Sequence, residues 1–360
     1  MNTFNSAKVH PYPHQVGGHC GSGALRDLLE WAGLGWGSPP TEGLVFALSG
    51  ALDLSYMRSP SLMPPVYLVG RGGDLELDLP RRLGATVTQR ATDDPDVGWD
   101  SVRAQIDAGK PVMVWSDIAE LPYLRVRLRM SRHDIVIIGY DDAKQIAFVV
   151  DNDREEVQEV PYEALARARS SASFPEPTRH MMYDIAWPTT LPSLGAAAAE
   201  AFQQAADAMR GTGGSLIAVP EHQSVHATGL GAADAFAADI AVWEEAFDEA
   251  ELGALLFGLY AFIEKAGTGG GLFRRLLAEG SAEIATETHD NATADLASSA
   301  ARAAEAWTEL ARQAGKKDLP LRDRFARAVE AAQLLPALEA SLVEQLDRAA
   351  RSLSPNRSRA

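Results

Sequence analysis

Residues 14–34 read HQVGGHCGSGALRDLLEWAGL and include Cys20, the only cysteine in a chain of 360 residues. After it, the apolar residues Leu25, Leu28 and Ala32 recur at the i, i+3, i+7 spacing of one helix face. The cysteine therefore stands at the predicted start of a helix. The unpaired amides of a helix start carry partial positive charge, which lowers the pKa of a thiol and favours its nucleophilic thiolate.

Small residues surround this cysteine. Gly18 and Gly21 leave room for a substrate to approach the backbone, and Ser22 is a candidate helix cap. The amides of Cys20 and Gly21 can stabilise an oxyanion, so we place Gly21 and Ser22 in a predicted substrate-binding set. A lone cysteine is often only a small buried hydrophobic residue. This stretch alone leaves the reactive and the structural interpretation open.

A second stretch supplies the partners that a nucleophilic cysteine needs, a base and a group that orients it. Residues 133–153 read HDIVIIGYDDAKQIAFVVDND, which predicts a β-hairpin turning near residue 142. His133 and Asp151 are then equally far from the turn and would lie opposite one another, within hydrogen-bonding reach. Taken singly, each could be an ordinary strand-end or turn residue. Their paired positions favour a catalytic set of Cys20, His133 and Asp151.

The two halves of the chain differ in composition and in the secondary structure that they predict. Up to about residue 187, short β-rich runs such as PVMVWSDI and HDIVIIGY alternate with a few helical runs. After WPTTLPSLG, which is typical of a linker, the chain becomes rich in Ala, Leu and Glu and almost wholly helical. We therefore predict an α+β protein, with a mixed first domain over residues 1–190 and an all-α helical domain over residues 191–355.

Composition excludes several classes of protein. Lys and Arg number 33 against 49 Asp and Glu, and the net charge of −16 repels a nucleic-acid backbone. A single cysteine cannot form an internal disulfide. The first residues lack the apolar core of a leader peptide, and no apolar run approaches the ~20 residues that cross a bilayer. We expect a cytoplasmic protein with neither a nucleic-acid nor a membrane partner.

The order of a glycine-flanked Cys, a strand-starting His and an Asp one strand later resembles papain-like cysteine peptidases, and within them the bacteriocin-leader peptidases. Residues 14–160 resemble the N-terminal domain of the butirosin biosynthesis protein H family. The segments that carry this resemblance are GGHCGSGALRDLLEWAGL, EGLVFALSGAL, AGKPVMVWSDIAELPY and RHDIVIIGYDDAKQIAFVVDND. The helical half resembles the companion domain of that family, chiefly through GTGGGLFRRLLAEG.

The resemblance implies a papain-like domain, with the Cys20 helix packed on an antiparallel sheet, and a helical companion that acts as a lid or an oligomer interface. It also implies acyl transfer from the phosphopantetheine thioester of an acyl carrier protein to a small-molecule amine, with no intrinsic cofactor. Cys20 would carry the acyl group, His133 would act as the base, and Asp151 would orient His133. Two alternatives stay open: a cysteine peptidase or amide hydrolase, and a non-catalytic binding protein.

Papain-like enzymes place an oxyanion-hole Gln six residues before the cysteine, whereas this chain has His14 at that position and Gln15 one residue nearer. We predict Gln15 as the side-chain donor, with His14 as its rival. Asp117 follows a predicted strand, and an Asp occurs in this stretch of the resembled family. It is a candidate contact for a substrate amine, or simply a turn residue.

The segment LRVRLRMSRH, residues 124–133, is the one local basic patch. Its alternation predicts that Arg125, Arg127 and Arg129 share one face of a strand. Such a face is usually only solvated, but acyl carrier proteins are strongly acidic, so these arginines are candidates for carrier docking. The His residues near Cys20 match no tight zinc spacing, and we predict no metal site.

Overall fold

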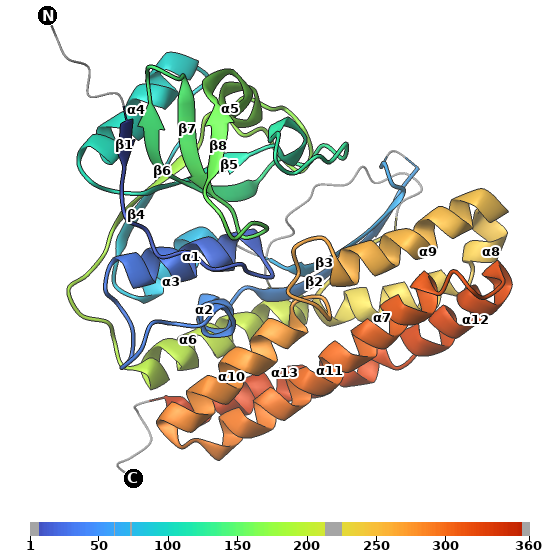
Figure 1. The fold of residues 1–360 in the computed structure, drawn as a ribbon. Helices are drawn as coiled ribbons and strands as arrows, with labels where there is room; N and C mark the ends of the chain where they lie inside the picture. Colours follow the sequence, from blue (N-terminus) through green and yellow to red (C-terminus); the bar gives the residue numbers. More distant parts are fainter. Residues whose placement is uncertain (1–6, 61, 73, 213–224, 355–360) are drawn as a thin grey trace, which may run out of the picture. The chain divides into compact units, whose positions relative to one another are not determined.

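The computed structural model describes residues 7–60, 62–72, 74–212 and 225–354 (Figure 1). The fold is α+β with antiparallel sheets, as the sequence predicts. The chain forms two compact units, one of residues 1–40 and 83–191 and the other of residues 41–82 and 192–360. The predicted boundary near residue 190 coincides with the start of the last segment. Residues 41–82, however, belong to the second unit and not to the first.

The first unit is built around one sheet. Its strands are ordered β4-β9-β5-β6-β7-β8, every pairing is antiparallel, and β1 also pairs with β6. The helix α1 packs against β6. The elements are β1 (Ala7–Val9), α1 (Cys20–Trp31), β4 (Thr86–Arg90), α4 (Pro95–Asp107), β5 (Val112–Ser116), η1 (Ile118–Glu120), β6 (His133–Asp141), β7 (Ile146–Val150), β8 (Gln158–Pro161), α5 (Tyr162–Arg169) and β9 (Met182–Ala186).

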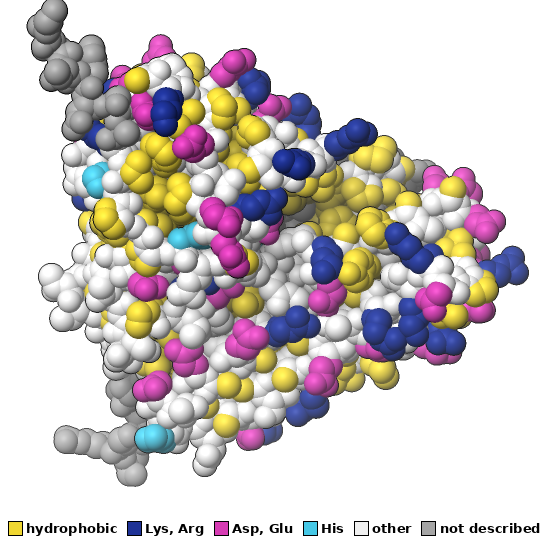
Figure 2. Space-filling model, in the orientation of Figure 1, with side chains coloured by type: hydrophobic (Ala, Val, Ile, Leu, Met, Phe, Trp, Pro, Cys, Tyr) yellow, Lys and Arg dark blue, Asp and Glu magenta, His cyan; other side chains and the backbone are white. Residues whose placement is uncertain are grey.

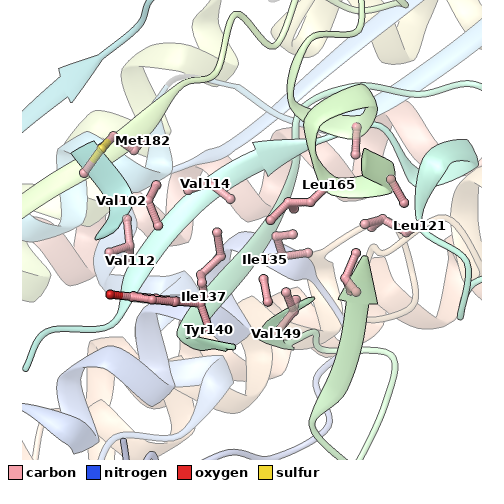
Figure 3. Packing of buried hydrophobic residues seen from close by; sticks show 14 of the residues in the cluster. Val102, Val112, Val114, Leu121, Ile135, Ile137, Tyr140, Val149, Leu165 and Met182 are labelled. Carbon is pink, nitrogen blue, oxygen red and sulfur yellow. The ribbon is translucent and has the colours of Figure 1, made fainter. Parts of the chain in front are cut away.

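The core of this unit lies on one face of the sheet, where α4 and α5 cover it. Apolar side chains from the central strands meet apolar side chains from the two helices, and all are at least nine-tenths buried (Figure 3). Ile135 and Ile137 of β6 point into this core. Because side chains alternate along a strand, Asp134 points to the opposite face. The residues of the cluster include Val102, Ile106, Val112, Val114, Val149, Leu165 and Ala168.

The β6–β7 hairpin has a different register from the one predicted. Asp141 pairs with Ile146 and Val136 pairs with Val150, with an irregularity between Ile137 and Gly139. The turn therefore lies past residue 142. Continuing the ladder by one step places Asp151 opposite residue 135, two residues from the position predicted. His133 is thus a diagonal neighbour of Asp151 rather than its direct partner.

The second unit combines helices with a small antiparallel sheet of order β10-β2-β3. The region after residue 191 is helical, as predicted, and contributes the short strand β10. The elements are α2 (Glu42–Ser49), β2 (Leu52–Arg58), β3 (Val66–Arg71), α3 (Leu75–Arg82), α6 (Leu194–Asp207), η2 (Ala208–Thr212), β10 (Val225–Thr228), α7 (Gly229–Ile240), α8 (Trp243–Ala246), α9 (Glu249–Glu264), α10 (Arg274–Thr288), α11 (Asn291–Gly315), α12 (Leu321–Ala332) and α13 (Leu335–Leu353).

A buried ion pair ties this second unit together. Arg274 at the start of α10 donates two hydrogen bonds to the carboxylate of Glu339 in α13, over 2.9 and 3.1 Å, and neither side chain is exposed. The indole of Trp307 donates to the same carboxylate over 2.6 Å. The GTGGG run precedes α10 and forms the turn after α9. No described helix is long and apolar enough to cross a membrane.

Candidate active site

Cys20 is the first residue of α1, as the sequence predicts, and its side chain is half-buried. The cap of this helix is His19, whose Nδ1 accepts a hydrogen bond from the Ser22 amide over 3.1 Å. Ser22 is therefore not the cap, and its hydroxyl instead lies 3.0 Å from the same Nδ1. The amides of Cys20 and Gly21 stand too early in the helix to bond within it. They are the natural donors for an oxyanion at this position.

The structure brings His133 and Asp151 together. His133 is the first residue of β6 and Asp151 directly follows β7, and Nε2 of the imidazole lies 2.8 Å from Oδ2 of the carboxylate. Because Asp151 occupies Nε2, the ring nitrogen left for Cys20 is Nδ1. The Cys20 thiol and the His133 ring lie close enough to shift one another's pKa. Three residues from distant parts of the sequence thus meet at one site.

The electrostatics of the site favour a charged Cys20–His133 pair. Burial on its own raises the pKa of the Cys20 thiol, but His19 and His133 outweigh it and hold that pKa well below its ordinary value. Burial on its own lowers the pKa of His133, but the Asp151 carboxylate outweighs it and holds that pKa well above its ordinary value. A low thiol pKa beside a high imidazole pKa favours a thiolate facing an imidazolium.

Tyr123 completes the site, and sequence reasoning missed it. Its hydroxyl donates to Oδ2 of Asp151 over 2.7 Å, and the amide of Asp153 donates to Oδ1 over 3.2 Å. Burial on its own raises the pKa of Asp151, but His133 and these donors hold it below its ordinary value. Tyr123 lies 28 residues from Asp151 in sequence, in an irregular segment. No spacing rule could connect the two.

Asp134 is a second acidic residue that sequence reasoning did not single out. It follows His133 in β6, points to the other face of the sheet and is only 1% exposed. The start of α1 brings the Cys20 sulfur to that face, where Sγ lies 3.9 Å from Oδ2 of Asp134. The only signal in the sequence is a charged residue inside an otherwise apolar strand.

The two predicted oxyanion donors lie elsewhere. Both ring nitrogens of His14 are engaged, Nδ1 with Asp27 and Nε2 with the carbonyl of Arg154, each over 2.7 Å. Gln15 is exposed, and its amide donates to Glu30 over 3.4 Å. These contacts tie the segment before α1 to its surroundings. Neither side chain is directed at the Cys20 thiol, so backbone amides remain as the donors that the geometry supports.

Asp117 has a structural role and not a substrate-binding one. Its side chain is fully buried, and it accepts hydrogen bonds from the hydroxyl of Ser171 over 2.6 Å and from the amides of Ala119 and Met130 over 3.0 and 3.3 Å. It therefore caps η1 and holds two loops, rather than facing a substrate amine. Ser22 is also fully buried and Gly21 is buried, so the Ser22 side chain is not exposed to a ligand.

The basic segment before β6 is not a strand. Arg125, Arg127 and Arg129 are exposed in irregular chain, and Arg125 has a positive φ of 55°. Arg129 pairs with Glu120 over 3.0 Å. The backbone of the segment bonds to loops, as when the amide of Met130 donates to Asp117. Figure 2 shows acidic and basic side chains intermingled over much of one face of the molecule.

The histidines near Cys20 do not surround a common point. Nε2 of His10 lies 2.8 Å from the carbonyl of Ile106, His14 bonds to Asp27, and His19 caps α1. No group of three or more His, Cys, Asp or Glu side chains that could hold a metal ion occurs in the part of the chain that the structure describes.

Comparison with known protein families shows which family the chain belongs to. Residues 19–152 match the family described as butirosin biosynthesis protein H, N-terminal, and residues 163–346 match a domain of unknown function, DUF4872. The chain belongs to the butirosin biosynthesis protein H family. The first match begins at His19 and ends one residue after Asp151, so it spans all the residues that meet at Cys20. A comparison with curated proteins gave no match.

Proposed function

We propose that this chain is an acyltransferase that moves an acyl or aminoacyl group from a thioester, through Cys20, to an amine. The observation that carries the proposal is the Cys20 thiol at the start of a helix, beside a His133 ring that lowers the pKa of the thiol and lies 2.8 Å from Asp151. This arrangement is that of an activated nucleophile, its base and the group that orients the base. The matched family is named for a biosynthetic pathway, and this favours a transfer reaction over a degradative one.

In the first step, the Cys20 thiolate attacks the carbonyl carbon of the donor thioester. A new carbon–sulfur bond forms, the donor's carbon–sulfur bond breaks, and the donor thiolate takes a proton from the His133 imidazolium. The amides of Cys20 and Gly21 stabilise the oxyanion between these events. One thioester replaces another, so this exchange is close to balanced in free energy. In the second step, an amine attacks the acyl-enzyme, and formation of the amide runs downhill.

The donor in this proposal is phosphopantetheine presented by an acyl carrier protein. Arg125 and Arg127 are exposed, and no ion pair engages them among the described residues, whose salt bridges in this segment begin at Arg129. The segment leads directly into His133, so a partner bound to it lies near the start of β6. A strongly acidic carrier fits a basic docking segment of this kind. Replacing Arg125 and Arg127 by Ser would raise KM for a carrier-bound donor, with kcat unchanged.

The test of the proposal is incubation of the protein with an acyl-pantetheine thioester, with and without an amine, followed by mass spectrometry. The expected result is a single acyl adduct on Cys20 that persists in buffer and resolves to an amide when amine is added. The Cys20→Ala variant controls for acylation elsewhere. Release of free acid at the same rate without amine would favour a hydrolase, and a protein that never acylates would favour a non-catalytic role.

A further inference from the structure

Residues 14–17 link α1 to the loop that follows β7. The amide of Gly17 donates to the carbonyl of Asn152 over 3.0 Å, and Nδ2 of Asn152 donates to the carbonyl of Gly17 over 3.1 Å. On the other side, the guanidinium of Arg26 in α1 donates to the carbonyl of Val16 over 3.3 Å. Because α1 starts with the nucleophile and the loop starts with the carboxylate of the site, this short segment connects two parts of the active site.

His14, the first residue of this segment, lies between two hydrogen-bond acceptors. Its Nδ1 lies 2.7 Å from Oδ2 of Asp27 in α1, and its Nε2 lies 2.7 Å from the carbonyl oxygen of Arg154 in the loop. A carbonyl and a carboxylate only accept hydrogen bonds, and a neutral imidazole has a single N–H. Both bonds are therefore made only when the ring is an imidazolium. The side chains of His14 and Asp27 are 8% and 3% exposed, so their contact is shielded from solvent.

The groups around the ring favour this charged form. Burial on its own lowers the pKa of His14, but the bonds to Asp27 and to the carbonyl of Arg154 outweigh it and raise that pKa above its ordinary value. Arg26 opposes this rise, and its Nε donates to Oδ1 of Asp27 over 2.8 Å. Asp27 thus lies between two cationic donors. The titratable side chains of this cluster are Tyr12, Arg26, Asp27, Glu30 and Arg154.

The two acceptors belong to segments that carry the active site. Asp27 lies about two turns after Cys20 in α1 and on the same side of that helix. The amide of Arg154 donates to the carbonyl of Asp151 over 3.0 Å, and its guanidinium donates to the carbonyl of Tyr123 over 2.9 Å. An imidazolium that bonds to both acceptors therefore ties the helix of the nucleophile to the residues that orient the base.

We propose that the His14 imidazolium is a positioning residue that holds α1, and with it Cys20, in place beside His133 and Asp151. The inference rests on the nucleophilic role that the proposed function gives to Cys20. It also makes the site sensitive to pH. A cation with a raised pKa stabilises the fold fully below the ordinary histidine pKa of about 6.5 and stops doing so as the pH rises through the raised value. The ring then keeps one N–H, one acceptor loses its donor, and the link loosens.

The charge of His14 is tested by nuclear magnetic resonance on the full chain labelled with nitrogen-15 histidine. The chain has eight histidines, and the signals that disappear in His14→Gln belong to His14. We expect both ring nitrogens of His14 to carry a proton at neutral pH, and the ring to become neutral only at a pH above the ordinary histidine value. A ring with one bare nitrogen at neutral pH would overturn the proposal.

The positioning role is tested by the pH at which iodoacetamide alkylates Cys20. His14→Gln keeps a donor toward the carbonyl of Arg154 and loses the bond to Asp27. We expect the midpoint of its alkylation profile to move upward by about half to one pH unit, the effect of one lost hydrogen bond on the Cys20 thiolate. An unchanged midpoint would overturn the role.

His10→Gln is the matched control. His10 also precedes α1, but its Nε2 lies 2.8 Å from the carbonyl of Ile106 in α4, and no hydrogen bond described for its ring reaches α1 or the loop after β7. We expect the alkylation profile of this variant to match that of the wild type. An equal shift in both variants would show that any change before α1 disturbs Cys20, and it would overturn the specific role of His14.

The outcomes separate this inference from the proposed function. A wild-type Cys20 that alkylates only near the ordinary thiol pKa contradicts the proposed function, whereas the charge of His14 is read from its own ring. Should His14→Gln not fold, His14→Asn keeps a donor toward Asp27 instead of Arg154 and is expected to shift the profile in the same direction. Should neither variant fold, the wild-type ring decides, with its signals assigned through the backbone: an imidazolium supports the proposal and a neutral ring overturns it.

Discussion

The reactivity of Cys20 comes from its neighbours. A thiol in an apolar setting has a raised pKa, and burial acts in that direction here. The helix start, His19 and His133 act in the other direction and prevail. Asp151 in turn keeps His133 charged, and Tyr123 keeps Asp151 ionised. Each residue therefore influences Cys20 through the residue that lies between them.

Tyr123→Phe tests this dependence. The variant removes the hydroxyl that bonds to Oδ2 of Asp151, so the pKa of that carboxyl rises toward its ordinary value. A carboxylate with a depressed pKa keeps its function above that pKa and loses it as the pH falls. We therefore expect acylation to slow about tenfold and its acid limb to move to higher pH. The measurement is the rate of Cys20 acylation against pH.

Tyr162→Phe is the matched control for this variant. The hydroxyl of Tyr162 also donates to a carboxylate, that of Asp142, over 3.0 Å in the first unit. Asp142 lies in the turn of the β6–β7 hairpin, at the opposite end of these strands from His133 and Asp151. Loss of this hydrogen bond should leave the pH dependence of Cys20 acylation unchanged. An equal shift in both variants would contradict a specific role for Tyr123.

Sequence reasoning reached some of these residues and missed others for physical reasons. Cys20 is identified by the helix that follows it, and His133 with Asp151 by their places at the ends of two apolar strands. Tyr123 and Asp134 reach the site through tertiary contacts that leave no periodic signal. The prediction for Gln15 came from a position in a resembled family, and here the local chain directs that side chain to Glu30.

At the scale of secondary-structure elements, strand β6 positions most of the site. It carries His133 and Asp134, and it pairs with β5, β7 and β1. The hairpin was predictable because two apolar runs flank a polar turn. Its register was not, because the irregularity between Ile137 and Gly139 has no signature in the residues themselves. The contact between His133 and Asp151 survives because a diagonal pair in a sheet is still within reach of a long side chain.

Gly139 is a position where β1 approaches β6 closely. A Cβ at this residue would lie 2.0 Å from the carbonyl oxygen of Lys8 and 2.8 Å from Cα of Val9. Gly139→Ala must therefore push β1 away, at a cost of about 1–3 kcal/mol in the free energy of unfolding. Urea denaturation measures this loss.

The control for Gly139→Ala is Gly231→Ala. Gly231 lies exposed in α7, and nothing stands within 4 Å of a Cβ built there. Ala favours a helix over Gly by up to about 1 kcal/mol, so this variant should unfold at a slightly higher urea concentration. A Gly139→Ala protein as stable as the wild type would show that β1 does not pack tightly on β6.

At the scale of the whole molecule, neither compact unit is one continuous segment of sequence. The change of composition near residue 190 lies next to one boundary of the compact units, between residues 191 and 192. Residues 41–82 contain two strands that look like those of the first unit, so the sequence gives no reason to assign them elsewhere. Their contacts decide the matter: a Cβ on Gly43 in α2 would lie 2.9 Å from the backbone of Gly280 in α10.

This assignment predicts the behaviour of a fragment. Residues 1–190 expressed alone would lack α10, although Leu44, Val45 and Phe46 of α2 are buried in the second unit. Exposure of such apolar side chains favours aggregation. We expect the fragment to be insoluble or to unfold without a cooperative transition, as measured by solubility and circular dichroism. A soluble fragment that unfolds cooperatively would contradict the assignment of residues 41–82.

The most direct test of the central claim is the rate at which iodoacetamide alkylates Cys20 as a function of pH, read by intact-protein mass spectrometry. Since Cys20 is the only cysteine, every adduct reports on it. We predict fast alkylation at pH values where an ordinary thiol, with a pKa of about 8.5, is protonated. His133→Gln should move the profile toward that ordinary value. A wild-type rate that rises only near the ordinary thiol pKa, with no change in His133→Gln, would contradict an activated Cys20.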